Sequence, residues 1–126
     1  MPHSDIRQYA AKAASTDTFG RVLCSVRDHH YVIDGPQQNG CPGEEVTPAE
    51  LFLSAVASCG VELLQVLAKS AGISLQGIAV DIEGRMDRSQ PVRPDLSLFN
   101  SVNLRFQMKG VTDGDAKQLV EKFKGR

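Results

Sequence analysis

The sequence contains no tryptophan, and aromatic side chains make up only 6% of its 126 residues. Few rings are therefore available to stack on the bases of single-stranded nucleic acid. An excess of either charge is also absent, because 14 Lys and Arg residues face 15 Asp and Glu residues, for a formal net charge of −1. A nearly neutral chain is not drawn electrostatically to nucleic acid or to an anionic membrane. Small molecules or further copies of the chain are the expected partners.

Cysteine is scarce, with Cys24, Cys41 and Cys59 as the whole complement. Their wide separation and the lack of any Cys-x-x-Cys pair exclude a disulfide scaffold, and the chain lacks the ligand spacing of a zinc site. We therefore predict no metal and no cofactor. An odd number of cysteines leaves at least one thiol free unless cysteines of two chains pair with each other. Reduced thiols and an N-terminus unlike a secretory signal lead us to expect a cytoplasmic protein.

Long hydrophobic runs are missing too. The longest apolar stretch, residues 51–57, is interrupted by Ser54 and soon followed by Glu62 and Gln65. It is shorter than the roughly 20 residues that a membrane span needs, so no membrane association is expected. The chain does have the length of one domain and, with 41% hydrophobic and 23% charged residues, a globular composition. We predict a single domain over residues 1–126.

The first part of the chain predicts a helix and then a hairpin. Apolar residues within 6–14 recur at helical spacing, with Ser4 as a possible N-cap, which indicates a short amphipathic helix. Residues that alternate between apolar and polar follow this helix, and turn-forming residues come after them. The predicted elements are a strand over residues 20–27, a turn over 28–30, a strand over 31–34 and a loop over 35–46.

A long helix is predicted from residue 47 onward. Thr47 can cap it, Pro48 suits its first position, and Glu50 places negative charge in its first turn. The residues that follow are apolar on nearly every side, and Gly72 is well placed as the C-cap. A helix that is apolar all round is buried on all sides. Because a chain this small can hardly cover such a helix alone, we expect a second subunit to cover part of it.

Two strands and a helix complete the prediction. Alternating apolar residues indicate strands over 75–87 and 102–108, joined through 89–94 as an antiparallel pair. Thr112 then caps a last helix with one apolar face. The predicted fold class is α+β, with antiparallel sheets packed on a long buried central helix.

Cys59 has the most unusual setting of the three thiols, midway along the long apolar helix. The thiolate is the reactive form, and Glu62, on the same helix face, would oppose its formation. Activation would need a cation from elsewhere, for which Arg27 and Arg21 of the hairpin are the candidates. Gly60 could loosen the helix and admit a close neighbour. A cysteine that is merely packed in the core is the alternative.

The other polar candidates favour structural roles. Cys24 alternates with apolar strand residues and is expected in the core, whereas Cys41 is expected to be exposed in its loop. His29 and His30 fit a solvated turn, or a base or binding group near the thiol. Asp34 is interpreted as a turn former.

Three parts of the chain resemble the OsmC/Ohr family. Residues 47–59, Thr-Pro-Ala-Glu-Leu-Phe-Leu-Ser-Ala-Val-Ala-Ser-Cys, are similar to the central helix signature of that family. Residues 26–36 are similar to its hairpin, and residues 71–73 and 78–84 to its strand entry. The similarity covers most of the chain.

The resemblance implies an intertwined homodimer with the long helices at its centre and Cys59 at the subunit interface. It implies a thiol-dependent peroxidase whose Cys59 thiolate attacks an organic hydroperoxide and becomes a sulfenic acid. An external thiol or dithiol would restore the enzyme. An arginine of the hairpin would keep the thiolate ionised, with Arg27 as the best match and Arg21 as the second. Glu50 is then either a charge of the first helical turn or the carboxylate that organises this arginine.

Two departures from the family pattern leave a second function open. The peroxidases carry Glu directly after the Pro of the helix start, where this chain has Ala49 and then Glu50. The second cysteine and the final strand of the family would fall beyond Arg126. This member would then work with one cysteine and external thiols, or the chain is shortened. The alternative function is a non-catalytic dimer that binds a small apolar or electrophilic ligand.

Overall fold

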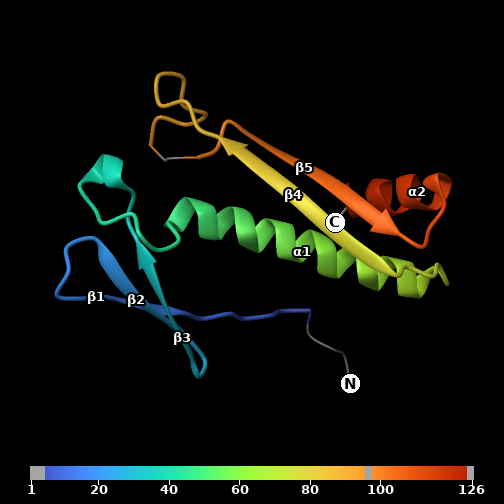
Figure 1. Cartoon of the computed structure of the whole chain (residues 1–126), viewed down its shortest axis with the longest axis horizontal. Helices are drawn as coiled ribbons and strands as arrows, with labels where there is room; N and C mark the ends of the chain where they lie inside the picture. Colours follow the sequence, from blue (N-terminus) through green and yellow to red (C-terminus); the bar gives the residue numbers. More distant parts are fainter. Residues whose placement is uncertain (1–4, 96–97, 125–126) are drawn as a thin grey trace. The chain divides into compact units, whose positions relative to one another are not determined.

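The computed structural model describes residues 5–95 and 98–124 (Figure 1). The chain separates into two compact units, one reaching to Leu51 and the other beginning at Phe52. Its elements are, in order, β1 (Lys12–Ser15), β2 (Arg21–Val26), β3 (His29–Asp34), the 3-10 helix η1 (Gln37–Asn39), α1 (Pro48–Ser70), β4 (Gly77–Arg85), β5 (Ser101–Lys109) and α2 (Asp113–Lys124). The helix α1 begins in the first unit and carries the chain into the second.

A three-stranded antiparallel sheet in the order β1–β2–β3 makes up much of the first unit. Its first strand overlaps the end of the helix that the sequence predicted over residues 6–14, and residues 6–11 lie in no helix or strand, so that prediction was wrong. Ile6 and Tyr9 are 80% and 86% exposed, which means that their helical spacing does not mark a buried face. A helix this short is marginal without a surface to pack on, and β2 offers ladder hydrogen bonds instead. Ser4, the predicted cap, lies outside the described residues.

β2 and β3 form the predicted hairpin, with a tighter turn than expected. Val26 pairs with His29, which leaves Arg27 and Asp28 as the turn residues. Arg27 has a φ of 53°, in the left-handed region that suits the first position of some two-residue hairpin turns. His29 and His30 therefore begin β3, and the prediction that both lie in a turn was wrong.

The loop between β3 and α1 folds back over the base of the hairpin. The Gly35 N–H donates to the carbonyl of Gly20 at 2.8 Å. Cys41 lies against both glycines, since a Cβ atom on either of them would overlap its sulfur. Cys41 is thus half-buried, whereas the sequence predicted an exposed residue. The two glycines allow this close approach, so the thiol fills a specific place in the unit.

Both ends of α1 agree with the sequence prediction. The Thr47 Oγ1 accepts the Glu50 N–H at 3.3 Å, and the Glu50 Oε1 accepts the Thr47 N–H at 3.0 Å, which is a capping box. At the C-terminal end, Gly72 has a φ of 69°. The N–H groups of Gly72 and Ile73 donate to carbonyls of the last turn at 3.3 and 2.9 Å, as in a Schellman motif.

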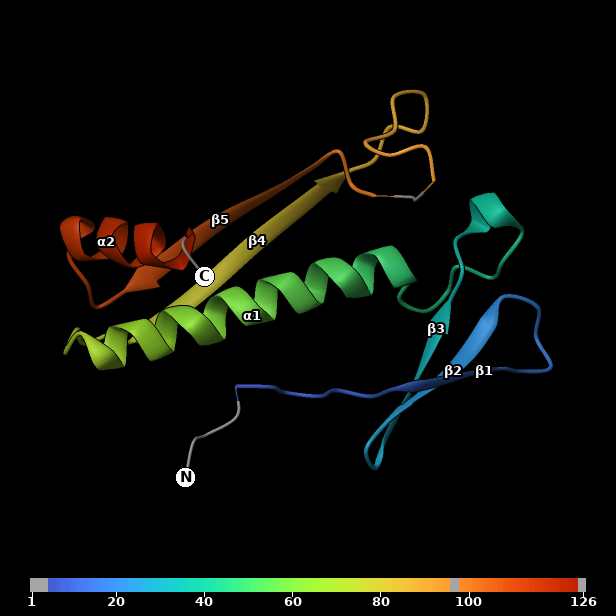
Figure 2. The ribbon, with the colours of Figure 1, turned by 180° about the vertical axis from the view of Figure 1, so that it is seen from behind.

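The second unit is a two-stranded antiparallel sheet with two helices against one face (Figure 2). β4 and β5 pair from Gly77 opposite Lys109 to Arg85 opposite Ser101. Alternate residues of both strands face inward, which confirms the predicted strand pair. Thr112 caps α2 by accepting the Asp115 N–H at 3.1 Å. The core contains Leu64 and Ala68 of α1, Leu119 of α2, and Ile78, Phe106 and Met108 of the sheet.

In the single chain α1 is buried along one side only, which agrees with the expectation that a chain this small cannot cover the helix alone. Its buried residues are Gly60, Leu64 and Ala68, whereas Phe52 is 54% and Val66 is 44% exposed. The helix as a whole has 23 residues and the hydropathy of a membrane span, although its longest uninterrupted apolar run is short. One side of this helix packs on the β4–β5 sheet and on α2 and belongs to the core of the second unit.

Candidate functional site

Cys59 is exposed on α1, on the side away from the core of the second unit. The next residue, Gly60, is buried. A Cβ atom added there would lie 3.1 Å from the Cζ atom of Phe106 and 3.5 Å from that of Phe123. The aromatic pair of α2 and β5 therefore sits directly on the helix backbone, as the glycine suggested. Cys59 points about 100° away from Gly60 around the helix axis, and its side chain is exposed to solvent.

The exposed side of α1 carries a regular series of residues around the thiol. The series, called the Cys59 stripe here, consists of Phe52, Ala55, Cys59, Glu62 and Val66, and each of them is exposed. Their spacing alternates between three and four residues, which is the repeat of a helix seam that packs on another helix. Phe52 also stacks on Phe99 of the second unit, with ring centroids 5.7 Å apart. The Cys59 stripe thus contains an aromatic ring that stacks on a neighbouring ring, a thiol and one carboxylate.

Arg21 is fully engaged within the first unit. Its Nε and Nη2 donate to the two oxygens of Asp34 at 2.8 and 2.9 Å, and Nη2 also donates to Glu44 at 3.1 Å. One guanidinium thus faces two carboxylates, so this cluster has a net charge of −1. The hydrogen bonds that Arg21 donates to Asp34 and Glu44 raise the pKa of Arg21, against the effect of desolvation. A cation neutralised in this way is a poor candidate to stabilise a thiolate.

Asp34 is a buried carboxylate rather than the predicted turn former. Its side chain has no solvent exposure, and besides Arg21 it accepts the backbone N–H groups of Glu44 and Glu45 at 3.0 and 2.9 Å. The hydrogen bond from Arg21 is the main cause that holds the pKa of Asp34 well below its usual range. Desolvation opposes this effect, and the two backbone donors add to it. Asp34 is therefore ionised, paired and fully satisfied.

Arg27 is the other candidate cation, and its setting differs from that of Arg21. It lies exposed in the hairpin turn, in the left-handed conformation. The ion pairs found among residues 5–95 and 98–124 involve Arg21, Arg93 and Lys124, and not Arg27. Within the described residues, its guanidinium is thus not paired with a carboxylate.

Glu50 is engaged in the capping box described above. It accepts both the N–H and the hydroxyl of Thr47, each at 3.0 Å, and these bonds lower the pKa of Glu50. The structure therefore shows Glu50 as a charge of the first helical turn. Within the described part of the chain, none of its hydrogen bonds is to an arginine.

The remaining sequence candidates lie apart from this arrangement. Cys24 is buried in β2, which confirms its predicted place in the core. His29 and His30 are exposed, and the Nδ1 of His30 lies 2.8 Å from the hydroxyl of Ser25 on the paired strand. Across residues 5–95 and 98–124, the structure brings together no group of three or more His, Cys, Asp or Glu side chains that could hold a metal ion.

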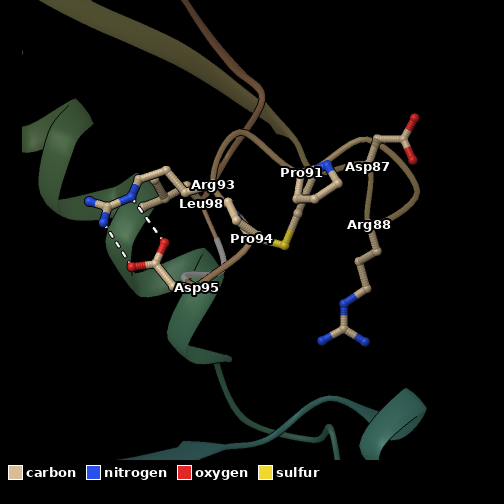
Figure 3. A pocket seen from close by; sticks show the side chains of 8 residues that line it. Asp87, Arg88, Pro91, Arg93, Pro94, Asp95 and Leu98 are labelled. Carbon is tan, nitrogen blue, oxygen red and sulfur yellow. Dashed lines mark hydrogen bonds and ion pairs between the residues drawn. The ribbon is translucent and has the colours of Figure 1, made fainter.

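Two hollows of the second unit contain no thiol. One, of about 350 Å³, lies in the connection between β4 and β5, where the Arg93 guanidinium turns back onto Asp95 and Arg88 points away from the pair (Figure 3). The other, of about 580 Å³, lies between β5 and α2 and is lined by residues such as Phe106 and Val120. Neither hollow is lined by a cysteine, so the candidate site for thiol chemistry remains the Cys59 stripe.

Comparison with known proteins identifies the family of this chain. The family model described as OsmC-like protein matches residues 41–126, which include all of α1 and the second unit. The chain belongs to the OsmC-like family. It matches no curated protein.

The fold of this OsmC-like protein matches solved structures of low sequence identity. An OsmC-like protein from Mycoplasma pneumoniae has a TM-score of 0.79 at 14% identity, over 95% of this chain and 82% of that one. An organic hydroperoxide resistance protein OsmC from Legionella pneumophila has a TM-score of 0.72 at 22% identity, over 94% and 83%. An organic hydroperoxide resistance protein from Elizabethkingia anophelis has a TM-score of 0.74 at 19% identity, over 95% and 83%. These likenesses establish the α+β fold with two sheets and a long helix.

Sequence reasoning missed two features of this OsmC-like protein, the buried carboxylate of Asp34 and the packing of Cys41. The first had a usable signal. A hairpin that turns at Arg27 and Asp28 places Arg21 directly opposite Asp34, and such a pair at the end of a ladder favours an ion pair. The predicted turn over residues 28–30 begins one residue too late, so the predicted hairpin does not place these two residues opposite each other. The contact of Cys41 with two glycines depends on loop packing and left no comparable pattern.

Proposed function

We propose that this OsmC-like protein is a thiol-dependent peroxidase that reduces organic hydroperoxides through Cys59. The observation that carries the proposal is the contrast among the three thiols. Cys59 is exposed on the family helix, Cys24 is buried in a sheet, and Cys41 is packed against two glycines. A peroxidatic sulfur has to meet its substrate, and Cys59 is the thiol whose surroundings allow it.

The proposed reaction has two stages. The Cys59 thiolate attacks the terminal oxygen of the hydroperoxide, the one that carries the hydrogen, so a sulfur–oxygen bond forms while the oxygen–oxygen bond breaks. The alkoxide leaves as the alcohol after it takes up a proton, and Cys59 becomes a sulfenic acid. An external thiol then forms a disulfide with Cys59 and releases water. A second thiol, or the second group of a dithiol, breaks that disulfide and restores Cys59.

An external reductant is favoured because the other two cysteines are poorly placed to act as partners. Cys24 is only 8% exposed, and Cys41 fills the space beside Gly20 and Gly35. Either sulfur would have to leave its packing before it could reach a sulfenic acid. The cycle is therefore proposed to use a small thiol or dithiol of the cytoplasm.

Arg27 is proposed as the cation that favours the thiolate form of Cys59. It is preferred to Arg21 because Arg21 already faces Asp34 and Glu44, whereas the Arg27 guanidinium has no ion-pair partner in the described residues. A positive charge close to the sulfur stabilises the thiolate over the thiol. Glu50 is the carboxylate available to orient that arginine, at the expense of its bonds to Thr47.

A second copy of the chain is proposed to pack on the apolar residues of the Cys59 stripe and to leave the thiol open to a small molecule. The stripe exposes apolar side chains at the spacing of a helix seam, and the resemblance to the OsmC/Ohr family implies an intertwined homodimer. Each chain would contribute one domain of 126 residues. Such an interface would give Cys59 apolar walls, which suit the alkyl part of an organic hydroperoxide.

Rapid mixing of the reduced protein with cumene hydroperoxide tests the proposal. We expect Cys59 to be oxidised at least a hundred-fold faster than a free thiol, on the order of the effect of a positioned catalytic group. Cys59→Ser should abolish the fast phase. Arg27→Ala should slow it strongly at neutral pH, and Arg27→Lys should keep part of the rate. Oxidation of Cys59 no faster than that of free cysteine would contradict the peroxidase.

A non-catalytic dimer that binds an apolar or electrophilic ligand is the second candidate. It is favoured by Glu62, whose carboxylate lies one helical turn beyond Cys59 and opposes a thiolate. Ala49, at the position where the peroxidases have Glu, also favours the non-catalytic function. This function predicts slow labelling of Cys59 by iodoacetamide at neutral pH, and fast labelling would count against it.

A further inference from the structure

One carboxylate shares the exposed side of α1 with Cys59. Glu62 is three residues further along the helix, and both side chains are exposed. Helical residues at this spacing are neighbours, with Cβ atoms about 5–6 Å apart. The turn of α1 that presents the thiol to a small molecule therefore presents a negative charge beside it.

Nothing on the helix itself balances the charge of Glu62. Between Leu51 and Ala68 it is the single charged residue of the sequence, and the ion pairs of the described residues involve other groups. The nearest cation on α1 is Lys69, two turns beyond Glu62, about 10 Å along the axis. If Arg27 balances the Cys59 thiolate, as proposed above, Glu62 leaves the site with a net charge of −1.

We propose that Glu62 is a specificity-determining residue that makes Cys59 favour uncharged substrates over anionic ones. The inference rests on the proposed peroxidase function and names the class of hydroperoxide, which is the neutral alkyl or aryl type rather than one that carries a carboxylate. The apolar residues of the Cys59 stripe attract the hydrocarbon part, and the Glu62 carboxylate repels an approaching anion. The same repulsion acts on anionic thiol reductants.

The expected size of the effect follows from Coulomb's law. Two unit charges about 6 Å apart in water repel each other enough to lower the rate for a monovalent anion about threefold. The factor grows where a covering subunit excludes water, and it falls as salt screens the charges. A charge effect can thus be told apart from a steric one by its salt dependence.

Iodoacetamide and iodoacetate provide a matched pair of probes. In both reactions a sulfur–carbon bond forms, the carbon–iodine bond breaks and iodide leaves, so the probes differ mainly in charge. The ratio of the two rates at one pH cancels the fraction of thiolate. Cleavage after Glu50 separates Cys59 from Cys41, and mass spectrometry of the resulting peptides reads the modification of each thiol.

We expect Glu62→Gln to raise the iodoacetate rate about threefold relative to the iodoacetamide rate at roughly 10 mM salt, and much less at about 0.5 M salt. Glu62→Asp keeps the charge and should keep the wild-type ratio. Glu83→Gln, which removes an exposed carboxylate of β4, should also leave the ratio unchanged. An unchanged ratio in Glu62→Gln would overturn the inference. If instead Cys59 fails to react rapidly with hydroperoxides, the proposed peroxidase function is contradicted. The alkylation ratio still decides whether Glu62 selects reagents by their charge.

Discussion

The Arg21 guanidinium holds the Asp34 carboxylate through two hydrogen bonds, of 2.8 and 2.9 Å, at a site where the carboxylate has no contact with solvent. The backbone of Asp34 is also bound, because its N–H donates to the carbonyl of Val46 at 3.1 Å. Val46 immediately precedes Thr47, the cap of α1. Through its backbone N–H, Asp34 therefore links the base of the β2–β3 hairpin to the segment that precedes the long helix.

Replacement of Asp34 by Asn should destabilise the first unit. The amide has the size of the carboxylate, but its NH₂ group would face donors that now bind an oxygen, and Arg21 would lose its buried counter-charge. We expect the melting temperature to fall by on the order of 10 °C. Asp95→Asn is the matched control, because its pair with Arg93 is exposed and should contribute little. Equal melting temperatures for the two variants would show that the buried pair is not a main support of the unit.

Asp34 should also make stability sensitive to acid. Its pKa is lower in the folded protein than in the unfolded chain, so folding favours the ionised form. The resulting stabilisation is fully present above the unfolded value of about 3.9 and is lost as the pH falls below it toward the folded value. Urea unfolding between pH 7 and pH 3 should show a steeper loss of stability for the wild type than for Asp34→Asn. Parallel curves would contradict this origin of the acid sensitivity.

The fold was predictable wherever local patterns and packing agree. The alternation in β4 and β5, the capping box at Thr47 and the glycine at the end of α1 each specify a local structure that the core then uses. β1 was missed because its residues are exposed on every position, so their pattern reflects pairing with β2 rather than burial. A strand that forms because it pairs with a neighbouring strand need not show a periodic pattern of apolar residues in its own sequence.

The candidate site was predictable in part. The sequence singled out Cys59 and both hairpin arginines, but it could not distinguish the two arginines. That distinction depends on the register that places Arg21 opposite Asp34, which is a long-range property of the hairpin. The exposure of Cys59 likewise depends on which side of α1 receives the ring of Phe106. An all-apolar helix does not specify that side by its periodicity.

Leu64→Ala should weaken the fold itself. Leu64 has no solvent exposure and packs within the core formed by α1, α2 and the sheet. Truncation of such a side chain removes burial and leaves a cavity, for a cost of about 3 kcal/mol. Val66→Ala, on the exposed side of the same helix, should cost the isolated chain under about 0.5 kcal/mol. Denaturant unfolding at low protein concentration measures both values, and a similar cost for the two would contradict the placement of the core.

Substitutions at Thr47 and Glu50 separate helix capping from chemistry. Thr47→Ala removes the acceptor of the Glu50 N–H and should cost about 1 kcal/mol of stability. Glu50→Gln can keep the capping box, so its stability should stay near that of the wild type. If Glu50 also orients an arginine, Glu50→Gln should nevertheless slow the oxidation of Cys59 by cumene hydroperoxide. A wild-type rate in this variant would leave Glu50 with its capping role alone.

Phe52→Asp should dissociate the proposed homodimer without unfolding the chain. Phe52 is 54% exposed at one end of the Cys59 stripe, and a carboxylate there would replace an apolar contact and add a second negative charge to the surface that already carries Glu62. We expect sedimentation velocity to show a shift from dimer to monomer at micromolar concentration, with an unchanged circular dichroism spectrum. Val92→Asp is the control, since Val92 is 56% exposed in the connection between β4 and β5. A wild-type protein that is monomeric at all concentrations would contradict the homodimer, and an equal effect of both variants would show that the stripe is not its interface.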